Sequence, residues 1–491
     1  MKLRMSEEIL INITPMESRV AVVENGVLQE VHVERTQRRG IVGNIYKGKV
    51  VRVLPGMQAA FVDIGLERAG FIHVGEIASR EGNAGSNETI SALVHEGQSL
   101  VVQVTKDPIG TKGARLTTQL SIPSRYLVYM PRTRHVGISL KIEDETERER
   151  LKRVVAECIA SEGIAEMGGF ILRTAADGAG ADEILMDIRY VRRLWEQIRG
   201  QMQAASSPSV IYQDLSLAFR TLRDLVSPRI EKVRIDSRET FQKIVQFVDE
   251  LMPEIAGRLE HYPGERPIFD LYGVEDEVQK ALERKVPLKS GGYLIIDPAE
   301  AMSTIDVNTG AFVGHRNLEE TIFKTNLEAA TTIARQLRLR NLGGIIIIDF
   351  IDMEDQEHQR QVLRTLEKQL ERDHAKTNLL GITELGLVQM TRKRTRESLE
   401  QVLCEPCSSC QGRGKLKAPE TICYEIFREI LREARAYQAG AYLVLASQKV
   451  IDRLLDEESA NVADLEGFIG RTIKFQVESM YSQEQYDVVL L

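Results

Sequence analysis

The sequence predicts a multidomain protein of mixed α/β and α+β class, and three observations lead to that class. The chain has 491 residues, too many for one ordinary hydrophobic core. Short segments of alternating polar and apolar residues fill the first 120 positions, as in β-structure. Residues 291–396 instead combine strand-like runs with helices that have one apolar face. We therefore expect β-rich and α/β parts with separate cores.

The N-terminal part is predicted to consist of strands. Residues 9–33 alternate in polarity around Asn25-Gly26, a dipeptide that favours a type I′ hairpin turn. From Asn44 to about Leu120, short strands separated by Pro and Gly turns predict a small closed barrel, for which an OB-fold is the natural candidate.

The middle of the chain predicts two further segments. Residues 121–214 form an α+β segment with a strand at 168–174 and helices near 145–158 and 191–203. Residues 215–284 are mostly helical by pattern, with a strand near Lys232.

The stretch from Gly291 to Arg396 is the most regular part. Two strands, YLIID and MSTIDVN, precede a long helix whose apolar stripe runs from Ile322 to Leu337. The apolar run Ile345–Ile348 predicts a central strand covered on both faces. A helix over 356–373 and two more strands complete a layered α/β domain. A helix over 420–436 and terminal strands predict a small appended domain.

Composition and charge narrow the class of protein. Hydrophobic residues make up 43% and charged residues 28%, as in a soluble globular protein. The net charge of -8 argues weakly against a polyanionic partner, but basic residues concentrate in 35–52, 106–134 and 392–396. Taken alone, each basic run is most simply explained as a charged surface exposed to solvent. The apolar run before Asp349 is too short to cross a bilayer, and Ser6-Glu8 interrupt any secretory signal, so we expect a cytoplasmic protein.

Asp306 and Asp349 are the central candidates for catalysis. Each lies at the end of an apolar strand, where an ionised carboxylate is costly unless something binds it. Two such strand ends side by side offer Mg²⁺ the oxygen ligands it prefers, and a bound ion can activate water and stabilise a phosphodiester in transfer. Asn308 follows on the same strand face, where it can orient a phosphate. One isolated Asp would more simply cap a loop; two in one domain favour a metal site.

Cysteine spacing indicates a second metal. Cys407 and Cys410 form C-x-x-C followed by Gly412 and Gly414, as in a zinc knuckle, although unligated surface thiols are the alternative. Two thiolates leave tetrahedral Zn²⁺ half coordinated. Cys404 lies nearby as a bystander or substitute ligand. Cys158 and Cys423 are expected to be ordinary buried thiols.

Two further residue sets suggest nucleic-acid contacts. Phe61 and Phe71 in the barrel, together with Lys106 and Lys112, suit single-stranded RNA, whose bases stack on rings while lysines meet phosphates. The alternative is that both rings fill the barrel interior. Arg173-Thr174 places a guanidinium fork beside a hydroxyl, a pair that suits a terminal phosphate.

Several long motifs resemble the ribonuclease E/G family. They are IDVNTG at 305–310, TNLEAATTIARQLRLRNLGGIIIIDFIDM at 325–353, CSSCQGRG at 407–414, and NIYKGKV, AAFVDIG and KGARLTTQLS in the barrel. The resemblance covers essentially the whole chain. It implies a split ribonuclease-H-like domain (1–38 and 215–284), an OB-fold RNA-binding domain (39–120), a 5′-phosphate sensor (121–214), a DNase-I-like catalytic domain (285–400), a zinc-link (401–416) and a small C-terminal domain (417–491).

The resemblance also implies roles for individual residues. Asp306 and Asp349 would hold Mg²⁺ with Asn308 beside them, and Phe61 and Phe71 would contact RNA. The positions that match the family's 5′-monophosphate pocket are Ser124, Val128, Arg173 and Thr174. Ser124 stands where another member of the family has glycine. Cys407 and Cys410 would share one Zn²⁺ between two subunits, giving a homodimer or tetramer.

The expected activity is endonucleolytic hydrolysis of single-stranded, A/U-rich RNA by a Mg²⁺-activated water, leaving a 5′-phosphate and a 3′-hydroxyl. By resemblance the substrates include the 5′ leader of small-subunit ribosomal RNA precursor and certain messenger RNAs. Because the sequence ends at Leu491, we expect the protein to be without the long polar tail by which some members of the family gather partners. A non-catalytic RNA-binding protein is the alternative, and a structural scaffold is a weaker one.

Overall fold

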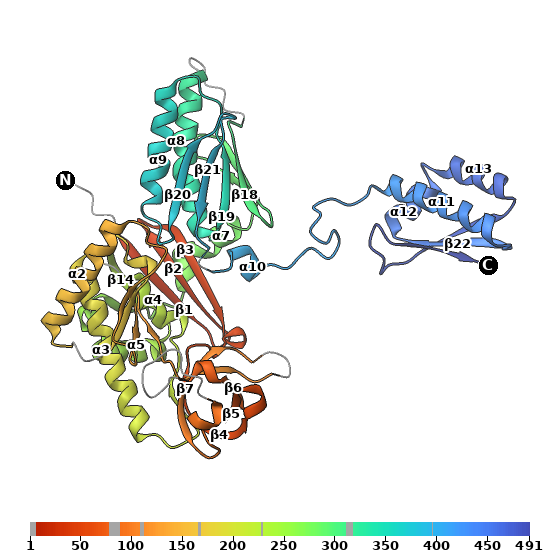
Figure 1. Cartoon of the computed structure of the whole chain (residues 1–491). Helices are drawn as coiled ribbons and strands as arrows, with labels where there is room; N and C mark the ends of the chain where they lie inside the picture. Colours follow the sequence, from red (N-terminus) through yellow and green to blue (C-terminus); the bar gives the residue numbers. More distant parts are fainter. Residues whose placement is uncertain are drawn as a thin grey trace. The chain divides into compact units, whose positions relative to one another are not determined.

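The computed structural model describes residues 6–77, 89–108, 112–164, 168–226, 229–310, 318–394 and 396–491. The chain divides into two compact units, residues 1–402 and 403–491 (Figure 1). Among the described residues, no helix combines the length and apolar character that crossing a bilayer requires. In the described part of the first unit, short 3-10 helices connect other elements: η1 (Thr36–Arg38), η2 (Pro55–Met57), η3 (Val74–Glu76), η4 (Thr174–Ala176) and η5 (Pro253–Arg258).

The first sheet joins two distant segments of the chain. Its order is β15-β14-β1-β2-β3, with β1 (Glu7–Ile13), β2 (Glu17–Glu24), β3 (Val27–Arg35), β14 (Ile230–Ile235) and β15 (Leu259–His261). The first three strands form an antiparallel meander, whereas β14 and β15 run parallel to β1. Asn25 and Gly26 have φ of 50° and 77°, which confirms the predicted hairpin turn. The associated helices are α4 (Leu217–Leu225), α5 (Arg238–Leu251), α6 (Ile268–Leu271) and α7 (Val274–Lys280).

The second sheet is a closed barrel. Its strands are β4 (Ile45–Leu54), β5 (Ala59–Asp63), β6 (Gly70–His73), β7 (Ser99–Lys106) and β8 (Arg115–Thr117), with α1 (Ile90–Leu93) beside them. The barrel closes because β4 pairs with both β5 and β7. A sixth strand, β13 (Ser209–Tyr212), also pairs with β4. Residues 209–212 were predicted to belong to the segment 121–214, but their backbone hydrogen bonds attach them to the barrel.

The third sheet lies in residues 122–172, in the order β11-β12-β10-β9. Its strands are β9 (Ile122–Pro123), β10 (Leu127–Met130), β11 (Val136–Ile138) and β12 (Gly169–Leu172), packed with α2 (Glu145–Glu162) and α3 (Ala181–Ala204). Helix α3 begins earlier than the apolar pattern predicts, because the Glu183 side chain accepts a hydrogen bond from the Gly180 backbone and caps the first turn.

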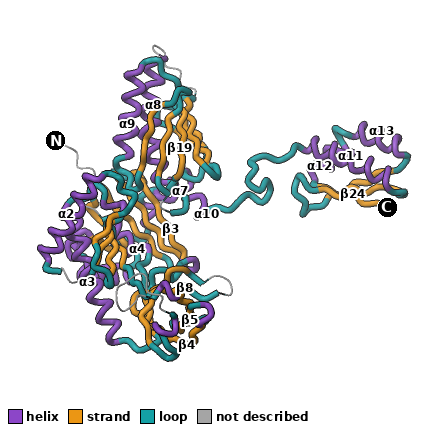
Figure 2. The backbone as a smooth tube through the Cα atoms, in the orientation of Figure 1, coloured by secondary structure: helices purple, strands orange, loops and turns teal. Residues whose placement is uncertain are grey.

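The fourth sheet carries the paired aspartates. Its order is β16-β17-β18-β19-β21-β20, with β16 (Lys285–Pro287), β17 (Tyr293–Pro298), β18 (Met302–Asn308), β19 (Gly344–Asp349), β20 (Thr377–Ile382) and β21 (Val388–Arg392). Helices α8 (Leu318–Leu339) and α9 (Gln356–Leu370) lie together along one face of this sheet (Figure 2).

The prediction that Ile345–Ile348 would be covered on both faces is wrong. Ile346 and Ile348 are fully buried under the helices, but Ile345 is 47% exposed on the other face. The run consists of isoleucine throughout, so the sequence hides a period-2 alternation that only the helix placement reveals. We call the face opposite the helices the open face.

The second unit is a three-stranded sheet in the order β23-β22-β24, with helices packed on it. Its elements are α11 (Pro419–Ala436), β22 (Ala441–Ala446), α12 (Gln448–Leu455), α13 (Ser459–Ile469), β23 (Thr472–Val477) and β24 (Tyr486–Leu490). The short helix α10 (Leu399–Leu403) precedes it. The helix predicted over 420–436 is confirmed.

Candidate functional site

The two candidate catalytic aspartates are direct neighbours across a parallel strand pair. The register of β18 and β19 places Asp306 opposite Asp349. Both side chains are exposed on the open face, since the alternate residues Ile305 and Ile348 belong to the core under the helices. Adjacent strands lie about 4.8 Å apart, so the two carboxylates share one small region at the end of the sheet.

The electrostatics of this pair suit a divalent cation. Partial desolvation, together with the negative charges of Asp306 and Asp352, raises the pKa of Asp349. Asn308 donates a hydrogen bond from Nδ2 to Asp306 Oδ2 at 2.8 Å, which fixes that carboxylate. Two converging carboxylates beside an amide are the oxygen-rich ligands that Mg²⁺ takes in proteins. The residues present therefore fit such an ion.

A buried amide holds the loop after Asp349 in place. Asn326 on α8 is fully buried, donates from Nδ2 to the Ile351 carbonyl at 2.8 Å and accepts from the Ile351 N–H at 3.2 Å. This clamp ties the end of β19 to the helix layer. The sequence prediction did not include Asn326. An amide side chain within the apolar stripe of the predicted helix is the signal that could have indicated a buried polar role.

A large cavity in the first unit is lined by residues other than the two aspartates. It has a volume of about 1060 Å³ and is lined in part by Lys141, Arg173, Thr174, Lys376 and Lys393. Burial, together with the charges of Lys141, Arg173 and Lys376, lowers the pKa of Lys393. Carboxylates also line the cavity, and Lys376 is paired with Asp177 at 3.7 Å, but the group of Lys141, Arg173 and Lys393 offers donors to an anion with several acceptor oxygens.

Of the four residues matched to a phosphate pocket, only Arg173 and Thr174 line this cavity. Ser124 is fully buried, and its hydroxyl donates to Asp187 Oδ2 at 2.6 Å. The Ser124 carbonyl accepts a hydrogen bond from Arg173 Nη1 at 2.5 Å, so this residue positions the guanidinium. Val128 is not among the residues that line the cavity, but it pairs across the strands with Ile171, which does line it. The sequence indicated Lys393 only as part of the basic run 392–396, and it did not single out Lys141 or Lys376. Separate segments of the chain bring the three lysines together.

The barrel presents a continuous row of aromatic and basic side chains. Phe61 pairs with Phe71, Phe71 with Arg115, and Arg115 with Lys106; Arg52 lies on the other side of Phe61. Their strand neighbours Val62 and Ile72 fill the interior, so the row is on the outside. The two rings contact edge to face, with centroids 5.9 Å apart. Of the two alternatives, the structure places both rings outside the barrel interior. Lys112 is exposed just before β8.

Cys407 and Cys410 lie in one tight turn. The Gln411 N–H donates to the Cys407 carbonyl at 2.7 Å, and Gln411, Gly412 and Gly414 all have positive φ. Hydrogen bonds from the backbones of Cys410 and Ser409 lower the pKa of the Cys407 thiol. A favoured thiolate in such a turn fits Zn²⁺. Cys404 is exposed, whereas Cys158 and Cys423 are buried as expected.

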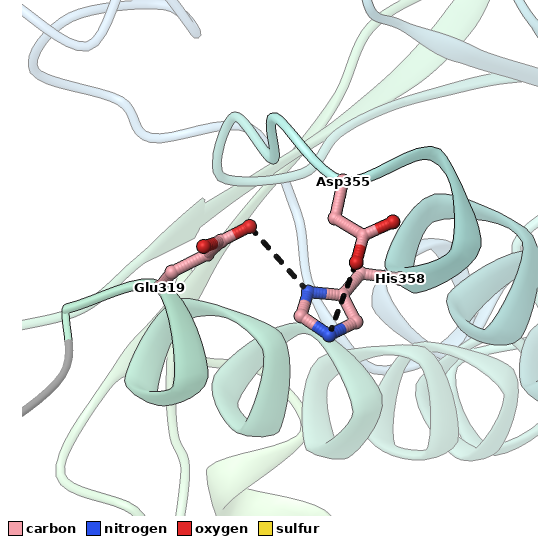
Figure 3. Close-up of side chains that lie close together, drawn as sticks. All are labelled: Glu319, Asp355 and His358. Atoms are coloured by element: carbon pink, nitrogen blue, oxygen red, sulfur yellow. Dashed lines mark ion pairs between the residues drawn. The ribbon is translucent and has the colours of Figure 1, made fainter.

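One further group of possible metal ligands lies on α8 and α9 (Figure 3). The two ring nitrogens of His358 face Glu319 and Asp355 at 3.9 Å and 3.8 Å, and the ring stacks on Phe323. Asp355 also accepts the Glu357 N–H at 2.7 Å and thereby caps α9. These contacts give the group a structural role where the two helices begin.

Comparisons with known proteins agree with these features. A model of the Ribonuclease E/G family matches residues 121–395, and one of the S1 RNA binding domain matches residues 41–116. The S1 match and the closed barrel confirm the predicted OB-fold.

Full-length relatives extend the similarity to both ends of the chain. Ribonuclease G of Escherichia coli (strain K12) is 55% identical over 494 residues, covering 99% of this chain and 100% of that protein. Ribonuclease G of Haemophilus influenzae is 54% identical over 492 residues, covering 99% of each. Ribonuclease E of Escherichia coli (strain K12) is 36% identical over 467 residues, covering 94% of this chain and 44% of that protein. From the match over residues 121–395 and these identities, the chain belongs to the ribonuclease E/G family.

Proposed function

We propose that this chain is a Mg²⁺-dependent endoribonuclease that cleaves single-stranded, A/U-rich RNA and is stimulated by a 5′-monophosphate. Membership of the ribonuclease E/G family makes it an endoribonuclease. The observation that carries the proposed site is the direct pairing of Asp306 with Asp349 on the open face.

In the proposed mechanism, Asp306 and Asp349 hold Mg²⁺ and Asn308 keeps Asp306 oriented. Bound there, the ion supplies a Lewis acid for the phosphodiester and makes a water more acidic. The Asn308 amide would also orient the scissile phosphate. Attack of water on phosphorus with departure of the 3′-oxygen yields a 5′-phosphate and a 3′-hydroxyl.

The RNA contacts are proposed to lie in two places. Bases stack on Phe61 and Phe71 while Lys106 and Lys112 meet phosphates. The terminal 5′-monophosphate enters the basic cavity at Arg173 and Thr174, because it carries more acceptor oxygens than an internal diester. Maturation of ribosomal RNA 5′ ends and decay of messenger RNA are the proposed cellular roles.

Cys407 and Cys410 are proposed to hold Zn²⁺ jointly with the same two residues of a second copy. Among the described residues, the side chains that group together as possible metal ligands are Glu319, Asp355 and His358. No third acidic, histidine or cysteine ligand is therefore grouped with Cys407 and Cys410. A second subunit would complete the tetrahedron and give a homodimer. Two such dimers would form a tetramer through further surfaces.

The test is cleavage of a short A/U-rich oligonucleotide carrying either a 5′-monophosphate or a 5′-hydroxyl, with and without Mg²⁺. Asp306→Asn and Asp349→Asn should each lower cleavage roughly a hundredfold or more, because a metal ligand is lost, while RNA binding is largely kept. Arg173→Gln should reduce the difference in cleavage rate between the 5′-monophosphate and the 5′-hydroxyl oligonucleotide. Cleavage that survives both aspartate changes would rule out this site. Binding without cleavage by the unaltered protein would favour a non-catalytic RNA-binding role.

A further inference from the structure

A lysine lies in line with the paired aspartates on the open face. The strand register pairs Lys285 with Ile295, Ile295 with Asp306, and Asp306 with Asp349. These residues therefore form one row across β16, β17, β18 and β19. Two strand spacings, roughly 10 Å, separate the backbone of Lys285 from that of Asp306.

An aromatic ring lies beside this lysine on the same face. Val286 and Leu294 belong to the core beneath α8 and α9, so strand alternation puts Lys285 and Tyr293 on the opposite, open face. Tyr293 pairs directly with Asn308, the residue that holds Asp306. The ring and the ammonium thus lie next to the proposed site.

The ammonium of Lys285 is fixed but not neutralised. Its Nζ lies 3.8 Å from the centroid of the Tyr293 ring, a cation–π contact. Within the described parts of the chain, no carboxylate lies within ion-pair distance of this Nζ, whereas the neighbouring Arg284 is paired with Asp297. The hydrogen-bond donors of Lys285 therefore remain available to an anion.

We propose that Lys285 binds a phosphate of the RNA strand next to the scissile phosphodiester, and that Tyr293 is a positioning residue that holds the lysine in place. This inference rests on the proposed catalytic role of Asp306 and Asp349. Those carboxylates repel an approaching polyanion, and a cation in the same row offsets the repulsion where the strand must pass. Because the ring already orders the lysine side chain, less conformational entropy is lost on binding.

The experiment measures affinity of the full-length protein for an uncleaved 5′-hydroxyl oligonucleotide in EDTA across a range of salt concentrations, and KM and kcat for its cleavage in Mg²⁺. Lys285→Gln should raise Kd and KM roughly fivefold, with a smaller change in kcat. One lost phosphate contact should also make the slope of log K against log salt shallower by about 0.7. Lys285→Arg and Tyr293→Phe should stay close to the unaltered protein, because the charge and the ring are kept. Tyr293→Leu should raise KM with less effect on the slope.

Lys243→Gln is the matched control, since Lys243 is an exposed lysine on α5 paired with Glu239. Equal Kd, KM and salt slope for Lys285→Gln and Lys243→Gln would overturn the proposal. If Lys285→Gln bound RNA with normal affinity but had a changed sedimentation coefficient, the proposal would also be overturned. The open face would then be a contact between subunits. If Asp306→Asn still cleaved RNA while Lys285→Gln flattened the salt slope, the catalytic assignment would fail and the lysine contact would stand.

Discussion

At the scale of single residues, a buried charged group joins the first sheet to the aspartate-bearing domain. Glu30 on β3 accepts hydrogen bonds from Arg338 Nε at 3.1 Å and Nη2 at 2.9 Å, and both side chains are 9% exposed. Burial alone would raise the pKa of Glu30, but the hydrogen bond with His32 and the charge of Arg338 hold it well below its usual value. His32 lies in the same group, with Nε2 at 3.4 Å from Glu30.

His32 makes the stability of the protein depend on pH. Burial lowers the pKa of His32 despite its hydrogen bond with Glu30, whereas an unfolded histidine titrates near its ordinary value of about 6.5. The unfolded chain therefore takes up a proton at a higher pH than the folded chain. The resulting stabilisation is fully present above about pH 6.5 and is lost as the pH falls through the lower folded pKa.

We predict that the thermal midpoint falls between pH 7.5 and pH 5.5, and that His32→Gln reduces this fall because the titrating group is gone. Differential scanning calorimetry at the two pH values measures the thermal midpoint of the unaltered protein and of the variant. His95→Gln, at an exposed histidine, serves as the control. A pH dependence in His32→Gln equal to that of the unaltered protein would contradict the assignment.

At the scale of elements, Arg392 at the end of β21 connects the fourth sheet to its helix layer. Its guanidinium donates to Asp373 Oδ2 at 2.6 Å and Oδ1 at 3.0 Å, and to the Leu342 carbonyl at 2.8 Å. The side chains of Arg392 and Asp373 are 5% and 1% exposed. One arginine on β21 thus connects the turns that follow α8 and α9.

Arg392→Met should destabilise the protein by about 3–5 kcal/mol, because the buried Asp373 carboxylate loses its partner. Adding Asp373→Leu should recover part of that loss, since no uncompensated charge then remains. Urea unfolding at a constant m-value measures both changes. Arg360→Met, which removes an exposed pair with Glu357 on α9, should cost about 0.5 kcal/mol or less. A loss for Arg392→Met no larger than that control would show that the buried pair contributes little.

At the scale of the whole molecule, the first unit contains the paired aspartates, the basic cavity and the barrel row, whereas the cysteine turn belongs to the second unit. The proposed zinc site would thus give the second unit a role in joining subunits. Its thiol pair offers half of a tetrahedral site, so assembly and metal binding should depend on each other.

We predict that chelation of zinc, or Cys407→Ser, shifts the protein from dimer to monomer in sedimentation velocity, with about one zinc lost per two chains. Cys404→Ser is the matched control, because Cys404 is exposed but lies outside the C-x-x-C turn, and this change should leave the dimer intact. A dimer that persists without zinc would place the subunit contact elsewhere.

The sequence by itself determined the local elements and the identity of the chemical groups. The alternation of polarity around Asn25-Gly26 predicted the first hairpin, and positions at strand ends identified Asp306 and Asp349. Both predictions are possible because the polarity period and the turn residues depend only on residues close together in the sequence. Long motifs that resemble a known family indicated the rest of the site.

Only the tertiary structure decided which faces are covered and which distant side chains meet. Helices on one face of the fourth sheet leave Ile345 and Lys285 exposed, and three separate segments bring Lys141, Arg173 and Lys393 into one cavity. The pairing of β13 with the barrel is another such outcome. The reason is physical: burial and electrostatic proximity are properties of packing between elements, and a local pattern records the period of an element but not its neighbours.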